Sequence, residues 1–365
     1  MKQTKNIMKL LVALLLVILI AACEGPEGPA GPEGPAGPPG DNYVNWEGFA
    51  EGIQCAACHN PDIDTVYYVW ARRTQWSISK HANGGSYIEN SSTCAPCHTT
   101  EGFIQQDLGQ AITGAAISSP IGCFACHSPH SRADFSLRTV DPVTMLAGVT
   151  GQPDITFDYG DGNLCASCHK PRSINPKPDP TKTAATDTIT ITSSRWYQHY
   201  GVQGLMLSGN NGFEFQGYNY TNSYHTTAQT ILDEGCATCH MAVSERNAAG
   251  GHTMWLEYEG QEMLVGCNQT GCHNGNLTSL DYNDVMTDTE VLMDSLHTLL
   301  LDRGWITASG SINASTSNPL KIAPAYLSGA LYNYFFVEHD ASLGVHNTNY
   351  ATQLLESSIE VLTAE

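Results

Sequence analysis

The chain has 365 residues, of which 36 are acidic and only 16 are Lys or Arg, so its formal net charge is −20. An acidic surface repels phosphate backbones and bare anionic lipid, and this excludes nucleic acid as an expected partner. The most informative feature of the composition is a set of 13 cysteines and 14 histidines, because their spacing follows a rule.

The first 22 residues are predicted to be a lipoprotein signal peptide. Lys2 and Lys5 give a positive start, and residues 10–20 form an apolar run that is short for a membrane span. Small residues precede Cys23, as in the bacterial lipoprotein cleavage box, so we expect lipidation at Cys23. The alternative is an ordinary signal peptide with a stray cysteine. Either predicts export, and the first predicts an anchor at the outer membrane or cell surface, with a periplasm-facing position left open.

Residues 23–41 carry the predicted lipid and a collagen-like repeat. Glycine occupies every third position from 25 to 40, with many prolines between. Such a segment cannot pack a core, and as polyproline II it would reach about 50 Å. We predict a stalk between the lipid and the rest of the protein, and a collagen trimer is the alternative.

The pattern C-x-x-C-H occurs five times after the stalk, and a stretched copy, C-x-x-x-x-C-H, follows. Two cysteines and an adjacent histidine are the attachment code of c-type haem: the thiols bond to the porphyrin and the histidine ligates its iron. The predicted haem-binding cysteines are Cys55, Cys58, Cys94, Cys97, Cys123, Cys126, Cys165, Cys168, Cys236, Cys239, Cys267 and Cys272, and the motif histidines are His59, His98, His127, His169, His240 and His273. The sequence therefore predicts six covalently attached haems.

Two other uses of cysteine are weaker explanations. Structural zinc needs paired half-sites and does not require histidine directly after cysteine each time. A disulfide framework suits an exported protein, but it predicts nothing about histidine. Haem c is therefore the favoured interpretation.

Six haems leave fewer than about 60 residues each, which is too few for separate domains, so residues 42–275 are expected to form one shared haem core. The predicted fold is mainly α with much irregular coil and few strands, in which short helices carry the motifs.

Threonine and isoleucine alternate within residues 186–193, which predicts a short strand or surface hairpin. Helices are predicted over 284–303, 325–334 and 350–362, and residues 276–365 would close over the core. The alternative is a separate helical domain.

Each iron needs a ligand on its second face, and eight histidines lie outside the motifs. His81 precedes Cys94 by 13 residues and His225 precedes Cys236 by 11, which looks like a repeated unit. His130 follows a motif as Cys126-His127-Ser-Pro-His130. These contexts mark candidate distal ligands without assigning each to an iron.

Over roughly residues 50–360 the chain resembles the multihaem cytochrome superfamily of pentahaem nitrite reductase, octahaem hydroxylamine oxidoreductase and the nitrifier tetrahaem cytochrome. The resemblance rests on the motifs and on the phrases Cys126-His127-Ser-Pro-His130, Cys239-His240-Met241, Gly251-His252-Thr253 and Gly344-Val345-His346-Asn347. It implies that the distal ligands are His81, His130, His199, His225, His252 and His346. The remaining two, His297 and His339, are expected to be structural.

The functional expectation is an electron carrier without substrate turnover of its own, which relays electrons between a membrane respiratory chain and an external or periplasmic acceptor. Redox proteins or an extracellular acceptor would be its partners. One alternative is an oxidoreductase with one open haem acting on a small nitrogen or sulfur compound, although the C-x-x-C-K motif of nitrite reductases is absent from the sequence. Another is a subunit of an extracellular cytochrome filament, or another homo-oligomer.

Overall fold

The computed structural model describes residues 55–132, 134–243 and 249–365, which belong to one compact unit, Gly48–Glu365. The predicted signal peptide, lipidated Cys23 and stalk lie outside these residues, so they stay predictions. Within the described ranges, no helix has the length and apolar character needed to cross a membrane.

The first third of the described chain consists of short helices joined by coil. The caps explain two of the starts: the Ser79 hydroxyl accepts a hydrogen bond from the backbone N–H of Ala82, and the Thr99 hydroxyl accepts one from Gly102. The elements are α2 (Cys55–His59), α3 (Val69–Ser77), α4 (Lys80–Asn83), η1 (Ser86–Ile88), α5 (Ala95–His98), α6 (Thr100–Asp107), α7 (Cys123–Cys126) and α8 (Pro129–Arg132).

The middle of the chain adds two antiparallel two-stranded sheets, and one strand of a third, among short helices. Its elements are β1 (Val143–Met145), β2 (Ile155–Phe157), α9 (Gly162–Ala166), β3 (Ile189–Ile191), α10 (Gln203–Ser208), η2 (Tyr224–Thr226), α11 (Gln229–Glu234), α12 (Ala237–His240), η3 (Gly251–Thr253), β4 (Glu257–Tyr258) and β5 (Gln261–Glu262). β1 pairs with β2, and β4 with β5.

The strand predicted within residues 186–193 is confirmed as β3, but its partner is not local. Ile189 pairs with Ile322 of β6 (Leu320–Ile322), far along the chain. Both isoleucines of β3 are buried, with Ile191 fully inaccessible. The surface-hairpin alternative is wrong, because the apolar face of the strand needs the core and a distant strand supplies the pairing.

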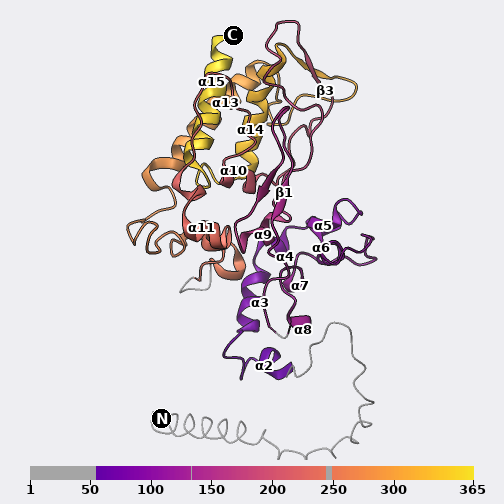
Figure 1. The fold of residues 1–365 in the computed structure, drawn as a ribbon, viewed down its shortest axis with the longest axis vertical. Helices are drawn as coiled ribbons and strands as arrows, with labels where there is room; N and C mark the ends of the chain where they lie inside the picture. Colours follow the sequence, from indigo (N-terminus) through magenta and orange to yellow (C-terminus); the bar gives the residue numbers. More distant parts are fainter. Residues whose placement is uncertain (1–54, 133, 244–248) are drawn as a thin grey trace, which may run out of the picture. The chain divides into compact units, whose positions relative to one another are not determined.

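The C-terminal region is built from long helices. They are α13 (Val285–Asp302), α14 (Ser328–Asp340) and α15 (Thr348–Ala364), with η4 (Tyr282–Asp284) and η5 (Ala325–Leu327) before the first two. All three predicted helices are confirmed; the second begins as the 3-10 turn η5 and α14 runs on to Asp340. Figure 1 shows α13, α14 and α15 side by side, and contacts join all three pairs.

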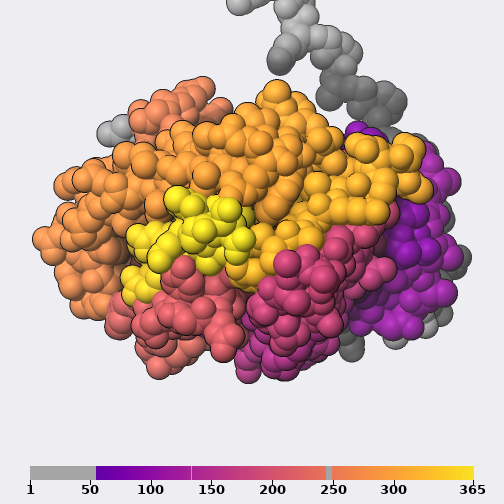
Figure 2. Space-filling model, turned by 90° about the horizontal axis from the view of Figure 1, so that it is seen from above, coloured from indigo at the N-terminus to yellow at the C-terminus, as the bar shows by residue number. Residues whose placement is uncertain are grey.

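These three helices share the largest hydrophobic core with the middle of the chain. The core takes Leu296 from α13, Leu331 from α14 and Leu354 from α15, together with Ile191 and Phe213. Figure 2 shows the yellow end of the chain lying between orange C-terminal segments and the pink-to-red middle of the chain. The predicted mainly helical fold with much coil and few short strands is confirmed.

Candidate haem-binding sites

The regular haem motifs lie on single helical turns. The histidine N–H donates to the carbonyl of the first cysteine in four of them: His98 to Cys94 at 3.2 Å, His127 to Cys123 at 2.8 Å, His169 to Cys165 at 2.9 Å and His240 to Cys236 at 3.0 Å. Positions i, i+3 and i+4 of a helix share one face. One turn therefore presents both thiols and the imidazole to the same side.

The stretched motif lies on turns instead of a helix, yet it closes in the same way. The N–H of His273 donates to the carbonyl of Cys267 at 3.1 Å, across two more residues than in the regular motif. The Asn268 side chain fixes the insertion, accepting from the N–H of Leu277 at 2.9 Å and donating to its carbonyl at 2.8 Å. The loop thus keeps the first cysteine beside the histidine.

The structure brings every motif histidine next to one of the six predicted distal histidines. The distances between ring centroids fall within a narrow range. They are His59–His130 at 6.2 Å, His98–His199 at 6.0 Å, His127–His252 at 6.2 Å, His169–His81 at 6.2 Å, His240–His346 at 6.3 Å and His273–His225 at 6.2 Å. Each of the twelve rings belongs to one pair.

This spacing fits a metal ion between two imidazoles. An iron holds each ring nitrogen about 2 Å away, which puts two facing ring centroids about 6 Å apart. Two rings in direct van der Waals contact could lie closer, at about 4.5 Å. The pairs therefore have the separation that a haem iron with two histidine ligands needs.

Several of these imidazoles are held in the neutral form that a metal ligand requires. Burial lowers the pKa of His81 and of His252 to about 4. Burial also lowers the pKa of His169, His225 and His240. At neutral pH these rings keep a free lone pair.

Backbone and side-chain acceptors orient the rings from behind. His225 Nδ1 donates to the carbonyl of Val345 at 2.7 Å, and His240 Nδ1 donates to the carbonyl of Met254 at 3.0 Å. His346 Nδ1 donates to the carboxylate of Asp340 at 2.7 Å. Such partners fix the tautomer of a ligating histidine and tune its basicity. The two carbonyl acceptors were not predictable from the sequence, because a backbone carbonyl has no side-chain signature.

The Asp340 contact also changes the ring that it touches. Burial alone would lower the pKa of His346, but the negative charge and hydrogen bond of Asp340 raise it, with a net upward shift of the pKa. The charge and the hydrogen bond of the carboxylate together therefore outweigh desolvation at this imidazole.

Cysteines of different motifs contact one another. Three pairs of thiols lie close enough for each thiol to shift the pKa of the other: Cys97 with Cys168, Cys165 with Cys236, and Cys239 with Cys267. All twelve described cysteines are free of disulfides. The second, fourth, fifth and sixth motifs therefore form a continuous row.

The third motif lies next to the fourth motif of this row, and the first motif lies next to the third. Cys126 of the third motif lies close enough to Cys165 for their charges to interact. The ring of Phe124, inside the third motif, is tilted against that of His130, with centroids 5.4 Å apart. His130 in turn faces His59 of the first motif.

The two histidines expected to be structural lie outside the pairs. His339 packs between Tyr197 and Tyr200, with ring centroids 4.4 Å from each, and its Nδ1 donates to the carbonyl of His199 at 3.1 Å. His297 lies 5.9 Å from the ring of Tyr334. Both contacts are with aromatic packing partners.

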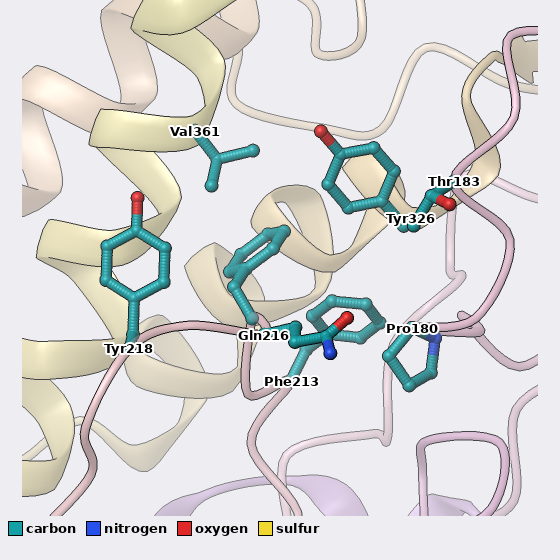
Figure 3. A pocket seen from close by; sticks show the side chains of 8 residues that line it. Pro180, Thr183, Phe213, Gln216, Tyr218, Tyr326 and Val361 are labelled. Atoms are coloured by element: carbon teal, nitrogen blue, oxygen red, sulfur yellow. The ribbon is translucent and has the colours of Figure 1, made fainter.

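One pocket of about 350 Å³ lies apart from this chemistry. Figure 3 shows the rings of Tyr218 and Tyr326 and the side chain of Val361 around it. Its lining is Pro180, Thr183, Phe213, Phe215, Gln216, Tyr218, Tyr326 and Val361, so it contains no cysteine or histidine. Among the described residues, no group of three or more His, Cys, Asp or Glu side chains is arranged to hold a metal ion, as structural zinc would require.

No protein-family model and no curated protein matches the chain. Among solved structures, the chain is similar to a cytochrome of the outer cell wall. That protein, outer cell wall cytochrome OcwA, superposes with a TM-score of 0.45 at 18% sequence identity, over 80% of this chain and 50% of its own. The chain thus spans about half the length of that cytochrome.

Proposed function

We propose that the protein is an exported c-type cytochrome with six haems, each ligated by two histidines, that carries electrons and has no substrate turnover of its own. The observation that carries this proposal is the set of six histidine pairs, at 6.0–6.3 Å, each joining a motif histidine to a distal one. Haem c supplies one-electron chemistry when bound.

The pairs assign a distal ligand to each motif. His130 serves the motif of Cys55 and Cys58, His199 that of Cys94 and Cys97, His252 that of Cys123 and Cys126, His81 that of Cys165 and Cys168, His346 that of Cys236 and Cys239, and His225 that of Cys267 and Cys272. With a histidine pair at each haem, no iron would keep a free position for a small substrate. This supports a carrier over an oxidoreductase with one open haem.

The contacts between motifs support conduction through the whole unit. Neighbouring sulfurs connect the second site to the fourth, the fourth to the fifth and the fifth to the sixth. The third site lies beside the fourth, and the first lies beside the third. The sites therefore form a branched network whose ends are the first, second and sixth. A branch offers more than one place for a redox partner to dock.

Export and anchoring complete the proposal. The predicted signal peptide, lipidated Cys23 and stalk would tether the haem unit at the outer membrane or cell surface. The net charge of −20 favours a cationic redox protein or an oxidised metal species as partner. The family proposed is the multihaem cytochrome superfamily named above.

Mass spectrometry and electron paramagnetic resonance of the oxidised protein test the proposal together. We expect six covalently bound haems and six low-spin ferric signals, and we expect the reduced protein to bind no carbon monoxide. A stoichiometric high-spin haem that also binds carbon monoxide would overturn the saturated carrier and indicate an enzyme. A molecular mass that corresponds to five haems would indicate that the stretched motif binds none.

A further inference from the structure

The loop between α14 and α15 holds a carboxylate against one of the paired histidines. Asp340 is the last residue of α14, and only 2% of its surface is exposed. Its Oδ1 accepts from Nδ1 of His346 at 2.7 Å, and its Oδ2 accepts a short hydrogen bond from the Ser342 hydroxyl. Both carboxylate oxygens are therefore engaged inside the protein.

We propose that Asp340 is a positioning residue that lowers the reduction potential of the haem held by Cys236, Cys239, His240 and His346. The inference rests on the proposed function, since it takes His346 as the second axial ligand. It deepens that function by assigning a low potential to a particular haem within the network.

The argument begins with the cost of a buried negative charge. A carboxylate taken out of water needs a positive partner. Nδ1 of His346 already carries the proton of its hydrogen bond to Asp340. His346 therefore cannot become an imidazolium while its Nε2 ligates a metal, because no nitrogen is left for a second proton. The balancing charge is then the ferric iron, and reduction removes it. In a low-dielectric interior the carboxylate therefore stabilises the ferric state over the ferrous state.

The hydrogen bond acts in the same direction. A carboxylate that accepts from Nδ1 gives the ring partial imidazolate character, which makes it a stronger donor to iron. A neutral carbonyl does this less, and a carbonyl is the acceptor for His225, which faces a different motif. Nδ1 of His98 and of His127 is buried without a hydrogen-bond partner in the described chain. The reduction potential of the haem of His346 is therefore expected to lie below those of the haems that His225, His98 and His127 would ligate.

The position of Asp340 is unfavourable for the helix itself. The C-terminus of α14 carries a partial negative charge, which repels a carboxylate. The next residues are also strained, because Ala341 and Leu343 adopt φ values of 58° and 47°. Both features are unfavourable for the free energy of folding, and together they place a carboxylate that faces His346.

The test is a spectroelectrochemical titration of the full-length, haem-loaded Asp340→Asn variant, with Asp302→Asn as the control. Asp302 is also the last residue of a long helix, α13, but it is exposed. In Asp340→Asn we expect the ferrous-to-ferric ratio of one haem, at a fixed potential, to rise at least tenfold, which corresponds to about 59 mV for one electron. The other five haems and all six in Asp302→Asn should titrate as in the parent.

A second variant predicts the opposite sign. Ser342→Ala removes the hydroxyl that donates to Oδ2 of Asp340, and also the acceptor of the His346 backbone N–H. The carboxylate then concentrates its charge on His346, so the midpoint of the same haem should fall. This variant keeps the carboxylate and decides the question if Asp340→Asn does not fold.

Electron paramagnetic resonance separates tuning from structural damage. We expect six low-spin signals in both variants, with the g-values of one haem displaced. Unmoved midpoints with six low-spin signals would refute the role of Asp340 and leave the proposed function intact. An equal displacement of all six midpoints would also refute it. A high-spin haem in the parent protein would instead contradict the proposed function.

Discussion

Each histidine pair joins an imidazole held on a local turn to one that comes from a separate segment. The motif histidine is placed by its own backbone, as His240 is by its hydrogen bond to the carbonyl of Cys236. The distal histidine depends on tertiary contacts, as His225 does on the carbonyl of Val345. At the scale of residues, each pair therefore combines a ring placed by its own turn with a ring placed by tertiary contacts.

Replacing one distal histidine should open one iron. In His252→Ala we expect one haem in six to become high-spin and to bind carbon monoxide after reduction, because His127 loses the ring that faces it at 6.2 Å. His297→Gln is the matched control, since this ring contacts Tyr334 and no paired histidine. Six low-spin haems in His252→Ala would contradict the assigned pair.

Asn333 is a fully buried polar residue of α14 that links the C-terminal helices to the middle of the chain. Its amide accepts from the N–H of Phe213 at 2.8 Å and donates to the carbonyl of Phe213 at 2.9 Å and to the hydroxyl of Ser358 at 3.1 Å. Asn333→Ala leaves these buried groups unpaired, which should lower the free energy of unfolding by about 2–4 kcal/mol. Denaturant unfolding measures it. The exposed Asn349→Ala should cost about 0.5 kcal/mol or less.

At the scale of elements, short irregular segments contact more of the paired histidines than the long helices do. Residues 340–347 provide the carboxylate for His346 and the carbonyl for His225, so this loop supports two pairs. Met254 supports one of these pairs from the other ring, because its carbonyl accepts from His240, which faces His346. It also supports a third pair, because its sulfur lies 3.3 Å from Nδ1 of His81. The long helices α14 and α15 hold the ends of the loop.

A glycine substitution tests whether this loop couples two haems. Gly344 has a φ of 85°, and a Cβ there would lie 2.6 Å from the Thr289 hydroxyl oxygen. Gly344→Ala should therefore displace both His346 and the carbonyl of Val345 and change two of the six low-spin signals. Gly310→Ala is the control, since its φ is 80° but no atom lies within 4 Å of the added Cβ.

We expect Gly310→Ala to lower the free energy of unfolding by roughly 1 kcal/mol through backbone strain alone, without changing any haem signal. Thermal unfolding and electron paramagnetic resonance check both variants. A change confined to one haem in Gly344→Ala would show that the loop does not link the two sites.

For the whole molecule, the acidic charge should control which redox partner reacts fastest. A net charge of −20 attracts cations over about one Debye length, roughly 10 Å at 0.1 M salt. We expect a cationic metal complex to exchange electrons with the protein more than tenfold faster than an anionic complex of matched potential at low salt. The difference should shrink as salt rises. Stopped-flow kinetics measures both rates, and salt-independent rates would contradict electrostatic steering.

The regular parts of the fold were predictable from periodic signals. The leucines at positions 292, 296 and 300 predicted α13, and the alternation around Ile189 predicted a strand. The partner of that strand was not predictable, because β6 lies beyond the haem motifs and contributes only three residues. Pairing over such a distance depends on burial of both isoleucine faces in a common core.

The sequence by itself determined the haem motifs, since covalent attachment requires cysteines and histidine at a fixed local spacing, and resemblance supplied the six distal candidates. Only the tertiary structure decided which distal histidine faces which motif, as for His81, which faces His169 instead of its neighbour in the chain, His98. It also placed Asp340 behind His346. Local spacing predicts covalent chemistry, whereas the two histidines of each pair come from separate segments that only chain packing brings together.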